Sequence, residues 1–548
     1  MINPRTGHPF SRRTLLGGAA GAAGAAVLAG CGPNGEGTGA GNGSGNGGEP
    51  NTSGVTLPTY TQIDVAADIE SPNEYCIPGF LRYPESPVSV VPEKPGDGTK
   101  TVTAFGQTSI SKSPPMEQNQ WWMNVNEQTG ITFDISWVKG AEFLPKVQTM
   151  IAGNDLPDVM SLPKLPRLGQ VLEAKFEDIT EYVSGDAIAE YPGLANFATA
   201  AWEQTVFDGS IRGISRPVVP ISSRLQARTD TLAELGIEPV FSDGEEFLAL
   251  CREITDREAG LFAMRQPTAT FFKAMFSLPN EWEQTDQGFR HEIESPRFTE
   301  YLEFVTSMWA EGLFHPESFV NANRMPEFQK PSFLLYEVGG AGFTKAMPLY
   351  TPGAPTLTVK PVVPPLVDGG GNAPTRITGA GDSLFALRKG IDPDHARTVL
   401  RMLNYFASPF GSAEYLTVQH GKEGYDFNID SDGQIVSTEH APNEIFPITL
   451  FPGTPAFNYS AGYPEVVEAE CAYEAEASKS VVLNAADGLY SPTAIDKETG
   501  LSRKITQEIS DIIQGRKQVS EWANVVKEFL ADGGDDIRAE YEEAAAAK

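Results

Sequence analysis

Hydrophobic and polar side chains alternate with two different periods in the first third of the chain. Ile131, Phe133 and Ile135 alternate with polar residues, which is the period of a strand with one buried face. The segment that follows has apolar side chains at helical spacing. The patterns predict, in chain order, a strand at 100–107, a helix at 117–130, a strand at 131–138, a helix at 141–155 and a strand at 156–162. This order favours an α/β fold with a parallel sheet and right-handed crossovers.

The expected parallel sheet also indicates where a ligand would bind. Ligands of open parallel sheets bind beyond the carboxyl ends of the strands. The loops at 107–116, 139–140 and 163–167 therefore face the expected site. Gln107, at the end of the first strand, and Lys164, after the third, are candidate ligand-binding residues. For Lys164 the alternative is a charge in a solvated loop.

The rest of the chain predicts further mixed structure. Asp208-Gly209, between short apolar runs, indicates a hairpin at 205–215. After the hairpin, the patterns predict helices at 243–257, 297–312 and 392–407, strands at 332–338, 359–365 and 382–389, and mostly helices from about 463 onward.

The N-terminal residues indicate export rather than a folded domain. Arg12 and Arg13 precede an uncharged stretch at 15–29, which is too short and glycine-rich to span a bilayer comfortably. Paired arginines in this position suggest twin-arginine export. Residues 28–31 read Leu-Ala-Gly-Cys and resemble a bacterial lipobox, in which Cys31 becomes the lipidated first residue of the mature protein. A secretory signal with an incidental cysteine is the alternative.

The segment at 31–54 is rich in Gly, Asn, Ser and Thr. Such a segment cannot bury enough apolar surface to offset its ordering entropy, so it predicts a flexible tether. We therefore expect a signal peptide at 1–30, a tether at 31–54, and a body held at the outer face of a membrane by the lipid on Cys31.

Composition narrows the choice of partners. The 548-residue chain carries a formal net charge of -31, and an acidic surface repels nucleic acid, so no nucleic-acid partner is expected. Cys76, Cys251 and Cys471 allow at most one disulfide. The histidines and cysteines lack metal-binding spacing, so neither a transition-metal site nor a cofactor is predicted. The length beyond the tether suits two or three domains.

Six motifs occur in one order along the chain: LPDV at 156–159, FDGSIRGISRP at 207–217, RTDTLAELG at 228–236, MWAEGLFHPESF at 308–319, FASPFGSAEYLTVQHGKEGYDF at 406–427 and IIQGRKQVSEWANVVKEF at 512–529. Behind a lipobox and a tether, this series resembles the family 1 extracellular solute-binding proteins of ABC importers. These are the maltose-binding-protein-like group, and the resemblance is to its long oligosaccharide-binding lipoprotein branch. It covers about residues 99–532. Thr231 stands where the branch usually has tryptophan, so no stacking role is carried over to it.

The resemblance implies two α/β lobes of the periplasmic-binding-protein type (type II), joined by crossing strands and closing on a ligand by hinge motion. It implies a monomer that captures an oligosaccharide and delivers it to an ABC permease, without enzyme activity. We expect an extended lead-in at 55–98, lobe one at 99–221 and 355–410, and lobe two at 222–354 and 411–548.

Candidate sugar-binding residues follow from the chemistry of the ligand. Such sites combine aromatic rings, for the apolar face of a sugar, with polar side chains for its hydroxyl groups. In addition to the two loop residues above, the candidates are Trp121, Arg224, Trp282, Phe343, Asp382, Tyr425, Phe457 and Tyr459. The alternatives are core packing for Trp121, a salt bridge for Arg224 and a helix-capping structure around Tyr425.

Other functions stay open on the sequence alone. The chain lacks Gly-x-Ser-x-Gly, His-Glu-x-x-His and phosphate-binding motifs, but its many carboxylates keep a secreted glycoside hydrolase as an alternative. An adhesion module would predict repeats or many short strands, which are absent. The same fold with a peptide or another small solute as its ligand is a further alternative.

Overall fold

The computed structural model describes, of the 548 residues, those at 54–108, 113–163, 165–320, 325–340, 344, 347, 351–379, 381–445 and 451–547. The chain divides into two units, Met1–Gly45 and Asn46–Lys548, and the description below concerns the second. Arg12, Arg13 and Cys31, and with them the predicted export signal and lipid attachment, lie outside the described residues. Among the described helices, none combines the length and apolar character needed to cross a bilayer.

The first lobe is built on a five-stranded sheet in the order β3-β2-β4-β15-β7. Its strands are β2 (Lys100–Thr108), β3 (Ile131–Lys139), β4 (Val159–Leu162), β7 (Ile214–Pro217) and β15 (Gly381–Leu387). Strand β2 pairs in parallel with β3 and β4, which confirms the predicted pairing, whereas β15 is antiparallel to β4 and β7. The chain leaves the first sheet for the second lobe at the end of β7, and it returns to the sheet at the start of β15. These two ends lie side by side, so β15 runs antiparallel to β7.

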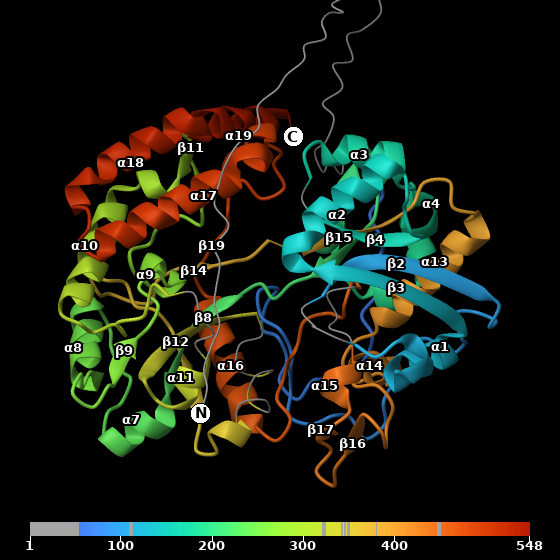
Figure 1. Cartoon of the computed structure of the whole chain (residues 1–548), viewed down its shortest axis with the longest axis horizontal. Coiled ribbons are helices and arrows are strands. Elements are labelled where there is room, and N and C mark those ends of the chain that lie inside the picture. Colours follow the sequence, from blue (N-terminus) through green and yellow to red (C-terminus); the bar gives the residue numbers. More distant parts are fainter. Residues whose placement is uncertain are drawn as a thin grey trace, which may run out of the picture. The chain divides into compact units, whose positions relative to one another are not determined.

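Helices cover both faces of this sheet (Figure 1). One face carries α2 (Gly140–Gly153) and α3 (Leu168–Lys175), and the other carries α1 (Gln120–Thr129) and α13 (Pro393–Phe406). Successive side chains of β2 alternate between the two cores: Phe105 stacks on Phe143 of α2, and Ala104 belongs to the core that contains Trp121 of α1. Burial on both faces applies to the middle of the sheet, where all four residues of β4 are buried, whereas Asp134 and Ser136 of the edge strand β3 are exposed.

The shorter elements of this lobe are α4 (Thr180–Val183), α5 (Pro192–Ala195), α6 (Thr199–Glu203), β5 (Val206–Phe207), β6 (Ser210–Ile211), α14 (Ala413–Gln419), β16 (Phe427–Ile429), β17 (Ile435–Ser437) and α15 (Ala441–Glu444). The hairpin β5–β6 confirms the predicted turn, since Asp208 and Gly209 both have positive φ, 50° and 71°. Two consecutive residues with positive φ are what a tight hairpin turn of this hand requires.

Asp158 of the LPDV motif joins three elements of the first lobe. Its Oδ2 accepts hydrogen bonds from the backbone N–H and the hydroxyl of Thr103 in β2, both at 2.9 Å. The same carboxylate contacts Arg388 at 3.1 Å and His395 of α13 at 3.2 Å. Burial alone would raise the pKa of Asp158, but these hydrogen bonds and the histidine hold it below its usual value.

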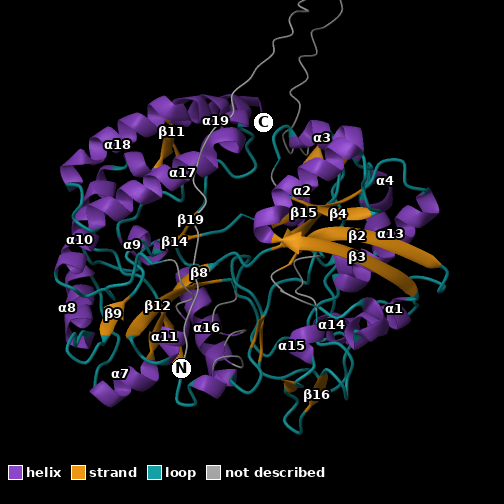
Figure 2. Ribbon diagram, in the orientation of Figure 1, coloured by secondary structure: helices purple, strands orange, loops and turns teal. Residues whose placement is uncertain are grey.

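The second lobe is built on a four-stranded sheet in the order β13-β8-β12-β9. Its strands are β8 (Ser223–Arg228), β9 (Phe262–Met264), β12 (Phe333–Gly339) and β13 (Val359–Val362). One hydrophobic core joins this sheet to α8 (Gly244–Ile254), α9 (Thr270–Met275), α10 (Pro296–Ala310), α17 (Pro492–Ile513), α18 (Trp522–Phe529) and α19 (Asp535–Ala547). Figure 2 shows the strands in orange with these helices around them.

The remaining elements are β1 (Gly79–Phe80), α7 (Thr229–Leu235), β10 (Trp282–Thr285), β11 (Gly288–His291), α11 (Met325–Gln329), β14 (Thr375–Arg376), β18 (Asn458–Tyr459), α16 (Pro464–Ala477) and β19 (Val481–Val482). The lead-in is extended and follows the body closely: β1 pairs with β18, and the N–H groups of Thr59 and Val88 donate to Gly185 and Gly411.

Strand pairing corrects one of the expected lobe boundaries, and core packing corrects another. Strand β13 pairs with β8 of the second sheet, so the chain does not return to the first lobe at residue 355 but between β14 and β15. In the other direction, Val418 of α14 and Phe451 pack in a core of the first lobe, so the second lobe does not resume at 411 but with α16. In both cases the contacts of a short segment with residues far away in the sequence decide its lobe. The local sequence pattern does not indicate those contacts.

A glycine exchange tests the end of α1. Gly130 follows the helix with φ of 64°, and an added Cβ would collide with the carbonyl oxygen of Gly96. We expect Gly130→Ala to lower the free energy of unfolding by on the order of 2 kcal/mol, measured by chemical denaturation. Gly153→Ala is the control, because an added Cβ there meets nothing within 4 Å. Equal stability of the two variants would contradict the assignment.

Candidate functional site

A cavity of about 730 Å³ is lined by residues of both lobes and of the segments that cross between them. The two lobes contribute side chains of different chemistry to its lining. The wall from the first lobe is mostly apolar and consists of Leu162, Pro163, Leu165, Leu168, Gln204, Phe207, Ser215, Ser383 and Leu384. Several of these residues follow β4, so the rule that places ligands at the carboxyl ends of strands identifies this wall from the sequence.

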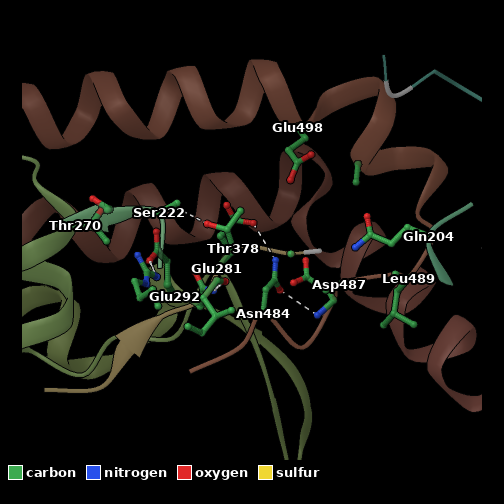
Figure 3. A pocket seen from close by; sticks show the side chains of 18 of the residues that line it. Gln204, Ser222, Thr270, Glu281, Glu292, Thr378, Asn484, Asp487, Leu489 and Glu498 are labelled. Atoms are coloured by element: carbon green, nitrogen blue, oxygen red, sulfur yellow. Dashed lines mark hydrogen bonds and ion pairs between the residues drawn. The ribbon is translucent and has the colours of Figure 1, made fainter. Parts of the chain in front are cut away.

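The wall from the second lobe carries most of the polar side chains and comes from several separate segments. Figure 3 shows Glu281, Glu292, Asn484 and Asp487 of this wall together with Glu498 of α17. Aromatic rings are also present, since Phe271, Tyr473, Tyr490 and Tyr541 line the same cavity. An apolar surface that faces polar groups and rings is the mixture that small polar ligands require.

Two crossing segments form one border of the cavity. The hydroxyl groups of Ser222, after β7, and Thr378, before β15, are hydrogen-bonded to each other (Figure 3). The backbone N–H of Thr378 also donates to Pro220 at 2.9 Å. Next to them, Ile221 and Ile377 pack against α16. The two crossing segments are therefore bound to each other and form one connected unit between the lobes.

Arg224 fixes this unit to α16. Its Nη1 lies 2.6 Å from Glu470 and 3.2 Å from Glu474, and all three side chains are fully buried. The guanidinium also donates to the carbonyl oxygens of Ile221 and Gly340, and it lies over the ring of Tyr473. Burial would lower the pKa of Arg224, but the two carboxylates raise it, so the side chain stays charged.

Glu292 forms ion pairs with Lys273 and Arg376, which are the other cations among the described residues that line the cavity. Lys273 of α9 lies 2.7 Å from its Oε1, and Arg376 of β14 forms an ion pair with its Oε2. Burial alone would raise the pKa of Glu292, but Lys273 and Arg376 hold it at about 2. The three charges therefore form one compact internal group at the wall of the second lobe.

Glu337 and Glu281 show two further environments for carboxylates. Glu337 accepts the N–H groups of Thr270 and Phe271 at 2.8 and 2.7 Å, yet burial raises its pKa above the usual value. Glu281 is exposed, accepts a hydrogen bond from Asn484 at 3.0 Å and has φ of 62°. A left-handed conformation in a residue other than glycine is uncommon, and such strain gathers at functional sites.

Among the predicted ligand-binding residues whose side chains are described, Arg224 is the one that lines the cavity. Trp121 is instead a fully buried core residue, whose Nε1 donates to the carbonyl oxygen of Val418 at 2.9 Å. Trp282 is buried against His291 and Tyr541. Both tryptophans thus take the structural role, because an indole ring buries more apolar surface in a core than at a cavity edge.

The other predicted residues lie away from the cavity or outside the described part of the chain. Gln107, the second-last residue of β2, pairs with Val138 of β3 and is not among the lining residues. Tyr425 stacks on His440 and hydrogen-bonds Glu444, while Phe457 and Tyr459 belong to an aromatic cluster around Phe410. The residues that lie outside the described set are Lys164, Phe343 and the side chain of Asp382.

The sequence interpretation missed most of the polar wall. Asn280 and Glu281 line the cavity and directly precede Trp282, the residue that its ring chemistry makes a candidate. The loop at 484–491 also lines the cavity, and its Asp487-Gly488 turn signal next to Tyr490 is a feature that sequence reasoning could have used. Lys273, Glu292 and Arg376 carry no local signal, since folding alone brings them together.

The described residues contain no group of three or more His, Cys, Asp or Glu side chains placed to hold a metal ion. Cys76, Cys251 and Cys471 are buried free thiols. Burial raises the pKa of all three thiols, which keeps them in the less reactive protonated form.

No known protein-family profile matches the chain. A curated protein that is similar is the polygalacturonan/rhamnogalacturonan-binding protein YtcQ of Bacillus subtilis (strain 168), which is 20% identical over 475 residues that cover 82% of this chain and 92% of that protein.

Several solved structures are similar in fold. The alginate-binding protein AlgQ2 is 16% identical with a TM-score of 0.58, covering 83% of this chain and 99% of that chain. An HMO-binding solute-binding protein associated with an ABC transporter, from Bifidobacterium longum infantis, is 12% identical with a TM-score of 0.60, covering 82% and 98%. FusA of S. pneumoniae, solved with kestose, is 14% identical with a TM-score of 0.56, covering 82% and 100%.

These likenesses confirm the predicted fold. The chain has the two-lobe α/β fold of solute-binding proteins of ABC transporters, with its cavity bordered by the crossing segments. The printed names of YtcQ, AlgQ2 and the Bifidobacterium protein state the sugars or polysaccharides that they bind.

The ion pairs of Glu292 predict a pH dependence. A carboxyl group with an ordinary pKa of 4.5 that falls to about 2 on folding stabilises the protein above pH 4.5 and loses this contribution as the pH falls toward 2. The contribution is about 3 kcal/mol. We expect Glu292→Gln to be less stable at pH 7 and to lose less stability than the wild type between pH 4.5 and 2, measured by denaturant unfolding.

Glu303→Gln, an exposed site on α10, is the control. Parallel pH profiles for Glu292→Gln and the wild type would refute the role of the ion pairs.

Proposed function

We propose that the protein captures a carbohydrate, in particular an oligosaccharide, in the cavity between its lobes and delivers it to an ABC importer. The observation that carries this proposal is the cavity itself, which has an apolar wall in one lobe and a polar wall in the other. A sugar has an apolar C–H face and hydroxyl groups at its edge, so it can satisfy both walls at once. The similarity to sugar-binding proteins of this fold supports the same conclusion.

Delivery to an importer needs a position outside the cell, and the N-terminal sequence supports one. We propose that the twin-arginine signal with Arg12 and Arg13 directs export and that Cys31 carries a lipid. The glycine-rich segment to residue 54 then tethers the body at the outer face of the membrane. In this arrangement the protein acts as a monomer that binds its ligand without cleaving it and contacts the permease.

Ligand binding tests the proposal directly. The body from residue 54 onward is heated with a panel of oligosaccharides, monosaccharides and peptides, and the unfolding midpoint is recorded. A ligand that binds only the folded state at 100 times its Kd adds about 2.7 kcal/mol, which raises the midpoint by several degrees. We expect a rise with an oligosaccharide that is recovered uncut. A rise with peptides alone, or consumption of the sugar, would contradict the proposal.

Tyr490 is the ring best placed to contact a ligand from the loop at 484–491. It is partly exposed, and its hydroxyl accepts the backbone N–H of Arg167 from the first lobe at 3.1 Å. We expect Tyr490→Ala to weaken oligosaccharide binding by about tenfold, because a ring of apolar area is lost. Tyr490→Phe retains the ring and should change affinity less.

The readout for Tyr490 is titration calorimetry, with the unfolding midpoint recorded for each variant. Tyr60→Ala is the matched control, since Tyr60 is 50% exposed and lies outside the cavity. Unchanged affinity in Tyr490→Ala would remove this ring from the site.

A further inference from the structure

The backbone of Glu281 is strained. Its φ is 62°, and the N–H of Trp282 donates to the carbonyl oxygen of Asn280 at 2.9 Å, so one hydrogen bond spans the three residues. With a positive φ at its centre, this is a classic γ-turn, which is rare and strained. Glycine adopts a positive φ at the lowest cost, and asparagine does so more readily than most residues. The presence of a glutamate at this position therefore needs an explanation.

Contacts on both sides of Glu281 maintain the turn. The side chain of Asn280 donates to the carbonyl oxygen of Ile377, in the second crossing segment, at 2.8 Å. The carbonyl oxygen of Glu281 accepts the N–H of Glu292 at 2.6 Å. Trp282 is only 3% exposed and anchors the chain in the core of the second lobe. A strained backbone persists only where the surrounding structure fixes it, and these contacts do so.

The side chain of Glu281 is exposed and lines the cavity. Its Oε2 accepts a hydrogen bond from Nδ2 of Asn484 at 3.0 Å (Figure 3). Asn484 is itself held by the N–H of Ala486, which donates to its Oδ1 at 3.0 Å. The amide therefore gives the carboxylate a preferred orientation, and the exposure of the side chain leaves the carboxylate within reach of a ligand.

The chemistry of a carboxylate restricts what it can bind. An ionised carboxylate accepts hydrogen bonds and donates none, so the ligand group that it contacts must be a donor. The hydroxyl groups of a sugar are donors, whereas its ring and glycosidic oxygens are not. Hydrogen bonds to a charged acceptor are also stronger than those between neutral groups.

We propose that Glu281 binds the ligand, and that the strained turn is retained because it directs this carboxylate to accept hydrogen bonds from hydroxyl groups of the sugar. This inference rests on the proposed function and assigns a specificity-determining residue to it. Strained residues cluster at functional sites, where stability is given up for activity. A purely structural role would favour glycine instead, because glycine forms the same turn without strain.

Two substitutions separate ligand binding from folding. Glu281→Gly relieves the strain and removes the carboxylate, whereas Glu281→Gln keeps the shape of the side chain and an acceptor for Asn484. We expect Glu281→Gly to raise the unfolding midpoint of the ligand-free protein, and both variants to bind the ligand about tenfold more weakly than the wild type. Scanning calorimetry gives the midpoint and titration calorimetry the affinity, both with the full chain.

The probes are the carbohydrates of the panel described above, among them maltotriose, kestose and trigalacturonate, and the variants are titrated with the one that the wild type binds most tightly. Unchanged affinity in both variants would overturn the inference and leave the proposed function intact. A lower unfolding midpoint in Glu281→Gly would also overturn it, because the glutamate would then contribute to folding. If the wild type binds no carbohydrate of the panel, the proposed function fails, and the inference fails with it.

Ser277→Gly is the matched control. Ser277 has φ of 50°, is exposed in the same loop after α9 and lies outside the cavity lining. We expect this variant to raise the unfolding midpoint and to bind the ligand as the wild type does. Binding as weak as that of Glu281→Gly would attribute the loss to the flexibility of the loop and would overturn the inference.

A double variant tests the part played by Asn484. Asn484→Ala should weaken binding less than Glu281→Gly does. The variant with both substitutions should bind no more weakly than Glu281→Gly alone, because the amide acts through the carboxylate. A combined loss equal to the product of the two single losses would show that Asn484 contributes independently, and would overturn its role in positioning Glu281.

Discussion

The buried contact of Arg224 with Glu470 and Glu474 is the constraint on which the arrangement of the lobes depends. Arg224 is the second residue of β8, directly after the first crossing, and α16 supplies both carboxylates. Glu474 also accepts hydrogen bonds from Ile77 in the lead-in and from Asn458 before α16. Segments far apart in the sequence thus converge on one helix. The loss of one partner would leave a buried charge unpaired, so the group constrains the geometry more than it adds stability.

The two lobes contribute different chemistry to the cavity because they present different parts of their structure. The first lobe presents the ends of its strands and the loop before α3, whose side chains continue an apolar core. The second lobe presents loops and helix surfaces, where carboxylates and amides can face solvent. The pairing of Glu292 with Lys273 and Arg376 neutralises the buried part of this wall. The exposed part contains the carboxylates of Glu281, Asp487 and Glu498.

The sequence predicted the elements of the first lobe well, because each has a local cause. Alternation at Ile131 and Phe133 predicted β3, and Gly130 ended α1 with the positive φ that glycine adopts without strain. Prediction of the site was much less successful. Trp121 and Trp282 were chosen for their ring chemistry, but the structure buries both. Ring chemistry alone does not separate a core tryptophan from one at a cavity.

The sequence by itself determined the class of fold, the order of its elements and the end of the first sheet that borders the cavity. Periodicity and turn residues act over a few positions, so they predict an element without knowledge of the segment against which it packs. The tertiary structure alone decided the lobe to which β13 and α14 belong, and it assembled the polar wall from Glu281, Glu292 and the loop at 484–491. These outcomes depend on contacts between residues hundreds of positions apart, and burial and ion pairing determine them only when the chain is folded.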